Sequence, residues 1–206
     1  MGPMEPDAFR LCTRVEDLPP ALWERLARRD PRDVARVAGA PWDGRGFRLR
    51  VVAAPVLVLP RTRRVVRAAD PYRSVRYPRA LVAVAYLGRA ADVPPAGRWL
   101  PLRDLPGGEA FFRGARAVDT PRLAAAFGPR PGSLAAAARA LGGGPVEAGP
   151  GAVELPALPR VPLRVVLGPG PSAEILADAG VLLHLPLEGL RALGNLVVSA
   201  LIREAP

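Results

Sequence analysis

The stretch FRLRVV, residues 47–52, alternates apolar and charged side chains and thereby decides the expected fold class. Its apolar positions include Phe47, Leu49 and Val51, and its charged positions are Arg48 and Arg50. A period of two predicts a β-strand with one buried and one exposed face. The stretches PVLVLP (55–60) and TRRVVRA (62–68) predict two further strands, with prolines at the strand ends. Residues 46–67 are therefore expected to form a basic β-meander.

Segments with helical spacing flank this meander on both sides. Residues 16–39 predict a pair of helices, the second with Asp30 as N-cap, Pro31 in its first turn and Gly39 as its C-terminal stop. The later patterns predict helices in 74–92, 119–128 (capped by Thr120) and 133–144, two strands in 151–168, and a last amphipathic helix from about Leu187. Because helices and strands do not alternate regularly, we expect an α+β fold with a mostly antiparallel sheet and helices packed on it.

The length and composition fit a single compact domain. Of the 206 residues, 50% are hydrophobic, which is enough to bury a full core. We expect one domain over 1–206, with a flexible tail at 1–15 and an α+β region at 72–206.

Neither a membrane protein nor a secreted one is expected. The longest apolar run, around 181–202, is interrupted by charged residues and a proline, so it does not predict a membrane span. The single cysteine, Cys12, excludes an internal disulfide and suits a reducing compartment. Residues 1–20 lack the apolar segment of a secretory signal. The sequence predicts a cytoplasmic protein without a membrane partner.

Arginine supplies all 29 basic residues, and the net charge of +10 is concentrated in one part of the chain. Between Arg45 and Arg79 lie ten arginines and a single acidic residue, Asp70. Guanidinium groups bind phosphate and carboxylate groups bidentately, so this segment predicts a site for an anionic small molecule or an acidic partner protein. The candidate binding residues are Arg48, Arg50, Arg61, Arg63, Arg64 and Arg67.

The first four of these arginines are expected to share one exposed face of the meander. A solvated sheet face that binds nothing is the structural alternative, because charged strand faces commonly point to solvent. Nucleic acid is a less favoured partner, since single strands bind on aromatic platforms and few aromatic residues lie nearby.

The stretch RWLPLRDLPGGEAFFRG, residues 98–114, carries a Pro-Gly-Gly turn that could border a pocket. The candidate pocket residues are Trp99, Asp104, Gly107, Gly108 and Glu109. The structural interpretation, which we favour, is a type II turn with Pro106 at its second position and a glycine at its third. In the functional alternative, Asp104 and Glu109 act as acid and base on a small anionic substrate held by arginines.

His184 is the only histidine of the chain. With one histidine and one cysteine, no zinc or iron–sulfur site built by the protein is expected. A packed side chain is the simpler interpretation of His184. The functional alternative is an axial ligand of a bound corrinoid or haem, oriented by Glu188, but the sequence leaves the identity of any cofactor unknown.

Several motifs in the second half of the chain resemble one protein family. They are Tyr86-Leu87, the Gly97-Arg98-Trp99 turn, Leu105-Pro106-Gly107-Gly108 and LPRVP at 158–162. Their order and spacing resemble the domain of unknown function 3786 family, over residues from about Trp23 to Leu201. The resemblance implies no known activity.

Members of this family occur mainly in anaerobic bacteria and archaea, and some are fused to a four-cysteine iron–sulfur domain. That domain is similar to one on corrinoid-dependent methyl-transfer proteins, which implies a link to iron–sulfur or one-carbon metabolism. The chain departs from the family at Pro150, where an aspartate is typical, and in GPGPSAEIL (168–176), which lacks an acidic run.

Taken together, these features predict a non-catalytic binding or accessory protein for an anionic ligand or an acidic partner. An enzyme acting on a small anionic substrate and a nucleic-acid-binding domain remain the alternatives.

Overall fold

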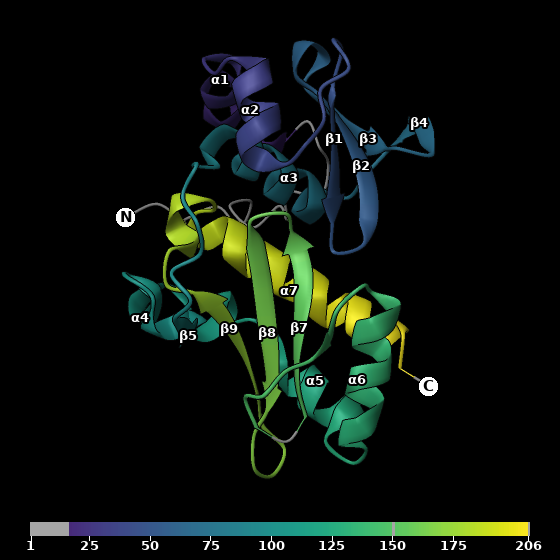
Figure 1. Ribbon diagram of the computed structural model, residues 1–206, viewed down its shortest axis with the longest axis vertical. Helices are drawn as coiled ribbons and strands as arrows, with labels where there is room; N and C mark the ends of the chain where they lie inside the picture. The colour runs from purple at the N-terminus through teal and green to yellow at the C-terminus, as the bar shows by residue number, and fades with distance from the viewer. Residues whose placement is uncertain (1–16, 150, 206) are drawn as a thin grey trace, which may run out of the picture.

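The computed structural model describes residues 17–149 and 151–205, which form two antiparallel sheets with helices packed on them (Figure 1). This confirms the predicted α+β class, although the strands divide between two sheets. The tail predicted at 1–15, Cys12 and Pro150 lie outside the described residues.

The N-terminal helical pair forms as predicted, with α1 at Pro20–Ala27 and α2 at Pro31–Ala38. Asp30 caps α2 because its side chain accepts hydrogen bonds from the backbone amides of Arg32 and Asp33. Gly39 ends the helix in the left-handed conformation, with a φ of 60°.

The first sheet is the predicted meander with a fourth strand that the sequence patterns did not indicate. Its strands are β1 (Phe47–Val51), β2 (Ala54–Leu59), β3 (Arg64–Arg67) and β4 (Asp70–Ser74), in the order β1-β2-β3-β4. The third strand was predicted to begin near Thr62 and begins at Arg64 instead. Residues Pro60–Thr62 form a 3-10 turn, and Arg63 then adopts a positive φ of 50°, which no strand residue does.

A series of helices follows the meander along the chain. It consists of α3 (Tyr77–Arg89), α4 (Gly108–Phe111), α5 (Thr120–Phe127) and α6 (Pro131–Ala140), with short 3-10 turns at Leu102–Asp104 and Gly114–Arg116. The predicted cap at Thr120 is wrong by one residue. Thr120 is already helical, and Asp119 stands at the N-cap without a side-chain hydrogen bond.

The second sheet has the strand order β5-β9-β8-β7-β6. Its strands are β5 (Trp99–Pro101), β6 (Gly144–Pro145), β7 (Ala152–Leu158), β8 (Val161–Leu167) and β9 (Ala173–Asp178). The predicted pair in 151–168 corresponds to β7 and β8, whereas β5, β6 and β9 were not predicted. After a 3-10 turn at Val181–Leu183, the chain ends in α7 (Leu187–Arg203).

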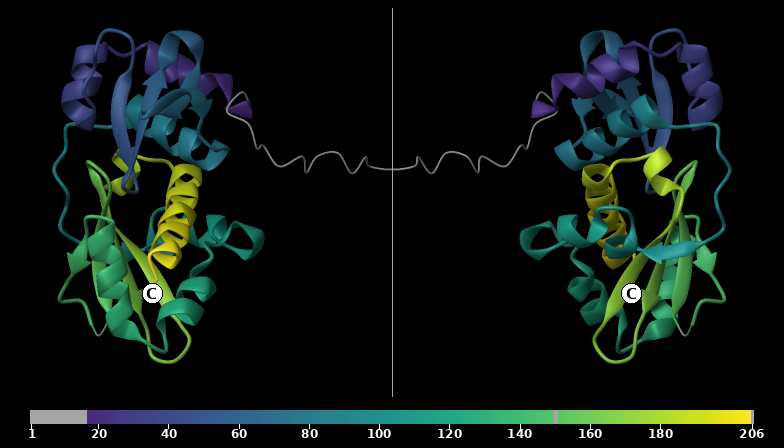
Figure 2. Two further views of the ribbon diagram at one scale, coloured as in Figure 1. Left: turned by 90° about the vertical axis from the view of Figure 1, so that its right-hand side faces the viewer. Right: turned by 90° about the vertical axis from the view of Figure 1, so that its left-hand side faces the viewer.

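Helix α7 lies at the centre of the molecule. It crosses behind β7 and β8 and packs against α3, as Figure 1 shows, and the side views in Figure 2 place it along one face of the second sheet, with the meander above it. The amide of Val52, just after β1, donates to the carbonyl of Ala157 in β7 at 2.9 Å and joins the two sheets.

One hydrophobic cluster contains buried side chains from both sheets, for example Phe47 and Leu163, and from α7, for example Leu193. This continuity is what a single domain requires, although the single-domain organisation itself stays a prediction. Among the described residues, no helix is both long and apolar enough to cross a membrane.

Candidate anion-binding site

A cavity of 710 Å³ lies between the meander, the beginning of α3 and the C-terminal half of α7. We call it the arginine cavity, because four of its lining residues are arginines. The lining residues are Ala54, Pro55, Val56, Arg67, Ala69, Val75, Arg76, Pro78, Arg79, Ala192, Asn195, Leu196, Ser199 and Arg203.

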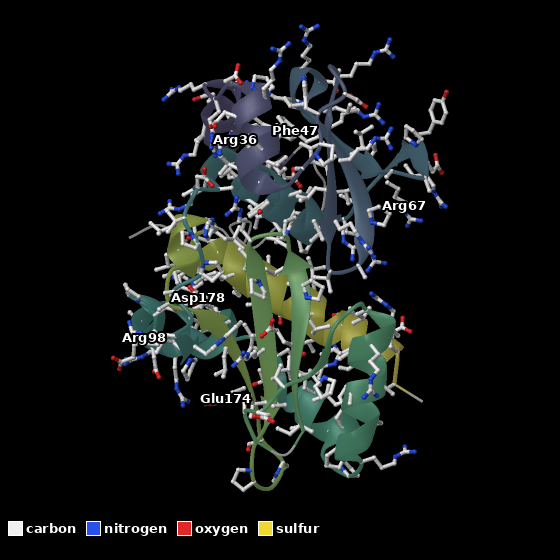
Figure 3. All side chains as sticks on the ribbon, in the orientation of Figure 1. Arg36, Phe47, Arg67, Arg98, Glu174 and Asp178 are labelled. Atoms are coloured by element: carbon white, nitrogen blue, oxygen red, sulfur yellow. The ribbon has the colours of Figure 1, made fainter. Side chains whose placement is uncertain are left out.

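Three parts of the chain bring the four arginines together. Arg67 ends β3 and lies directly opposite Val56 of β2, so it projects to the face of the meander that carries the buried Val56. Arg76 and Arg79 lie at the N-terminal end of α3, and Arg203 is the last residue of α7. Figure 3 labels Arg67 on the right-hand side of the meander, the side on which α7 ends in Figure 1.

The four guanidinium groups lack acidic partners within the part of the chain that the structure describes. None of them takes part in a salt bridge there, and none of the lining residues is an aspartate or glutamate. The Nε of Arg79 is buried without a hydrogen-bond partner among the described residues. Unsatisfied buried donors are uncommon in folded proteins, which makes this group notable.

Burial and repulsion both act on Arg79. Desolvation is the main cause that lowers its pKa, and the positive charges of Arg203 and Arg67 lower it further. A bound anion would offset the repulsion and could supply the missing hydrogen-bond acceptor. The cavity is therefore electropositive.

Two further features favour an anion in the arginine cavity. Helix α3 begins without a side-chain cap and without an acidic residue in its first turn, so its positive N-terminal end is uncompensated. Asn195 and Ser199 add polar groups from α7, and the Oδ1 of Asn195 accepts from the amide of Asp119 at 3.0 Å. That bond leaves the amide nitrogen of Asn195 as a donor.

The predicted arginines do not form a single face. Arg48, Arg50 and Arg64 lie opposite Leu57, Pro55 and Leu59, so these three share the outer face of the meander. Arg61 and Arg63 lie instead in the connection between β2 and β3, which corrects their assignment to a strand face. Arg67 projects to the other face of the sheet and is the one of the six that lines the arginine cavity.

Outer-face arginines already have partners, in contrast to those of the cavity. Arg48 approaches Asp43 at 3.9 Å, Arg50 donates to the carbonyl of Ala53 at 3.4 Å, and Arg64 donates to the carbonyl of Pro71 at 3.3 Å. Because these contacts are long and exposed to solvent, they hold the arginine side chains in place only weakly.

The Pro-Gly-Gly stretch forms the predicted type II turn. The amide of Gly108 donates to the carbonyl of Leu105 at 2.7 Å, and Gly107 has φ and ψ of 75° and −3°. At Gly108, a Cβ would lie 2.3 Å from the carbonyl oxygen of Leu102, so only glycine allows the chain to pass this closely.

The other candidate residues around this turn are engaged in local surface contacts. The Oδ1 of Asp104 lies 3.7 Å from the Nε of Arg103, and Glu109 forms an ion pair with Arg113, four residues further along the chain. Trp99 stacks under the guanidinium of Arg164, whose carbon lies 3.9 Å from the ring centre. A neighbouring cavity of 160 Å³ is lined by Arg103 and Phe112 among others, but by none of the five predicted residues.

The Gly97-Arg98-Trp99 turn has a structural cause. The buried carboxylate of Asp178 accepts hydrogen bonds from the amides of Ala96 and Gly97 at 2.9 and 2.8 Å, and from that of Gly180 at 2.8 Å. Asp178 therefore fixes the entry to β5 from the end of β9, where Figure 3 labels it.

His184 is packed in the interior, where 4% of its surface is exposed. Its Nδ1 accepts from the amide of Ala91 at 3.4 Å, and among the described residues it forms no hydrogen bond or ion pair with Glu188. Burial lowers the pKa of His184, and the nearby charge of Arg160 lowers it further, while Asp178 acts in the opposite direction. No group of three metal-binding side chains occurs within residues 17–149 and 151–205.

Sequence reasoning missed Arg203, Asn195 and Ser199, and it counted Arg76 and Arg79 in the basic segment without naming them as binding residues. The amphipathic pattern of the last helix placed Asn195 and Ser199 opposite its apolar stripe and assigned them no role. In the structure that face lines the arginine cavity, and both side chains are half-buried.

The fold and the cavity together define an α+β protein with an arginine-lined pocket. The chain belongs to the family described as domain of unknown function (DUF3786), whose sequence profile matches residues 30–200. No curated protein and no solved structure matches the chain significantly.

Proposed function

We propose that this protein is a non-catalytic cytoplasmic module that binds a small anion in the arginine cavity. The observation that carries the proposal is the convergence of Arg67, Arg79 and Arg203 on a cavity without a carboxylate, where the Nε of Arg79 is buried and unsatisfied. Holding like charges together costs stability unless a ligand compensates them.

The size of the cavity supports a small molecule over a macromolecule. A volume of 710 Å³ falls within the range of about 300–1,000 Å³ that is typical of small-molecule pockets. An exposed basic sheet face would instead favour an acidic protein or nucleic acid, and Arg48, Arg50 and Arg64 form such a face outside the arginine cavity.

The catalytic alternative draws on Asp104 and Glu109, which lie elsewhere. The helix that carries Glu109, α4, lies at the left of Figure 1, whereas α7 ends at the right. Both carboxylates are exposed and paired with neighbouring arginines, and neither lines the arginine cavity. Binding without catalysis is therefore the function that we favour.

Isothermal titration calorimetry with inorganic pyrophosphate tests the proposal. The wild-type protein is compared with the double variant Arg79→Gln/Arg203→Gln, which removes two cavity charges. We expect the Kd to rise at least about tenfold, because a hydrogen bond to a charged group contributes roughly 1.5–3 kcal/mol.

The matched control is Arg48→Gln/Arg50→Gln, which removes two charges from the outer face of the meander. It should leave the Kd within about twofold, since general charge effects are screened at 0.15 M salt. Equal losses in the two double variants would mean that pyrophosphate binds through overall charge. Absence of binding to the wild-type protein would reject the anion site.

A further inference from the structure

The arginine cavity is lined by two chemically different sets of residues, which we call its cationic wall and its apolar wall. Arg67, Arg79 and Arg203 supply a cationic wall, with Arg76 beside them. The rest of the lining is mostly small or aliphatic: Ala54, Pro55, Val56, Ala69, Val75, Pro78, Ala192 and Leu196. A ligand that fills the cavity must therefore combine an anionic group with an apolar part.

The cationic wall favours a group with two negative charges. Three guanidinium groups act on one another here, because Arg203 and Arg67 both contribute to the lowered pKa of Arg79. A single carboxylate would leave most of this repulsion in place. A phosphate monoester carries nearly two charges at neutral pH and offers three acceptor oxygens, which suits several arginines at once.

The apolar wall favours an aliphatic body over a nucleobase. No aromatic side chain is among the lining residues, so a base would find no ring to stack on. Alanine and proline side chains leave space beside Leu196, and a volume of 710 Å³ exceeds what an inorganic anion fills. Because stacking is excluded, the burial of methylene groups against the aliphatic side chains is the main favourable interaction that this wall offers a ligand.

From these two walls we infer that the ligand is an organic phosphate monoester with an aliphatic chain. This inference rests on the proposed function, since it assigns the ligand class of the same cavity. The phosphate contacts the guanidinium groups, and the chain lies along Ala192 and Leu196 of α7 and the β2 residues opposite.

A chain-length series tests the inference directly. Titrations of the full chain with methyl, butyl and hexyl phosphate should give a Kd that falls about fourfold for each buried methylene, which corresponds to about 0.8 kcal/mol. Adenosine monophosphate, which carries an aromatic base, should bind more weakly than hexyl phosphate.

Two variants of the apolar wall sharpen the test. Leu196→Ala should flatten the dependence of the Kd on chain length. Because Leu196 also packs against the core, Ala69→Asn in the exposed β3–β4 turn serves as a second variant, with the same expected result.

The outcomes separate this inference from the proposed function. If methyl and hexyl phosphate bind equally, or adenosine monophosphate binds best, the aliphatic assignment is wrong while the anion site stands. If pyrophosphate and all the alkyl phosphates fail to bind, both proposals are rejected. A chain-length dependence that both wall variants retain would place the chain outside this cavity and overturn the inference.

Discussion

Arg203, at the end of α7, faces Arg79, in the first turn of α3, across one cavity, and its charge contributes to the lowered pKa of Arg79. The two helices pack against each other, so the tertiary fold itself holds these like charges together. The folded protein therefore contains an electrostatic repulsion that dissolved salt should screen.

We expect the melting temperature of the wild-type protein to rise more steeply with sodium chloride than that of Arg203→Gln. Salt shortens the Debye length from about 10 Å at 0.1 M to about 3 Å at 1 M and so screens the repulsion that the variant lacks. Thermal denaturation between these two concentrations measures the difference. Arg61→Gln, which removes an exposed arginine outside the cavity, should behave like the wild type. Parallel curves for all three proteins would show that Arg203 adds no specific repulsion.

His184 should make the stability of the protein depend on pH. Burial lowers its pKa from the ordinary value of 6.5, so the unfolded chain binds the proton more readily than the folded protein. The contribution of neutral His184 to the free energy of unfolding is thus fully present above pH 6.5. It is lost as the pH falls towards the lower pKa that His184 has in the folded protein. Urea denaturation at several pH values from 7.5 to about 5 measures this loss.

The variant His184→Gln should show a smaller decrease of stability over the same pH range, since it carries no titrating group. An equal decrease in both proteins would assign the effect to other residues.

Tyr86 ties three segments together through its hydroxyl group. The hydroxyl donates to the carbonyl of Ala38 at 2.9 Å and accepts from the amide of Arg160 at 3.2 Å, while the ring is fully buried. Burial raises the pKa of this hydroxyl, so it stays protonated and remains a donor. Tyr86→Phe should lower the free energy of unfolding by roughly 1–3 kcal/mol, because two buried backbone groups lose their partner. Urea denaturation of this variant at neutral pH checks the value, and a change below about 0.5 kcal/mol would contradict it.

The Pro-Gly-Gly turn should matter for stability and not for ligand binding. In Gly108→Ala the new Cβ would meet the carbonyl oxygen of Leu102, and overpacking of this kind typically costs roughly 1–3 kcal/mol. Gly132→Ala is the matched control, since no atom lies within 4 Å of its Cβ position in α6. Thermal denaturation should show a melting temperature for Gly132→Ala that is equal to that of the wild type or slightly higher.

Glu109→Gln tests the functional interpretation of the same turn. It should leave both the melting temperature and the affinity for pyrophosphate unchanged, because Glu109 is exposed and pairs with Arg113 outside the arginine cavity. A large loss of affinity in this variant would restore Glu109 to the binding site.

Local patterns in the sequence predicted much of the fold. The alternation of 47–52 predicted β1, and the helix-capping residues Asp30, Pro31 and Gly39 predicted both ends of α2. These features depend on residues a few positions apart, so their physical cause is present in the chain itself. Strands β5 and β6 are too short to show a period, and β4 carries no buried residue that would mark one face, so these strands were missed.

For the site, the sequence determined that positive charge gathers between Arg45 and Arg79, and it identified Arg67 as a candidate. Only the tertiary structure decided which arginines meet. Register in the meander turns Arg67 to the face opposite Arg48, and the packing of α7 on α3 brings in Arg203 from the other end of the chain. A cavity wall formed by residues this far apart has no local periodicity. The geometry of the cavity depends on long-range packing, whereas the number of arginines and their positions along the chain are given by the sequence.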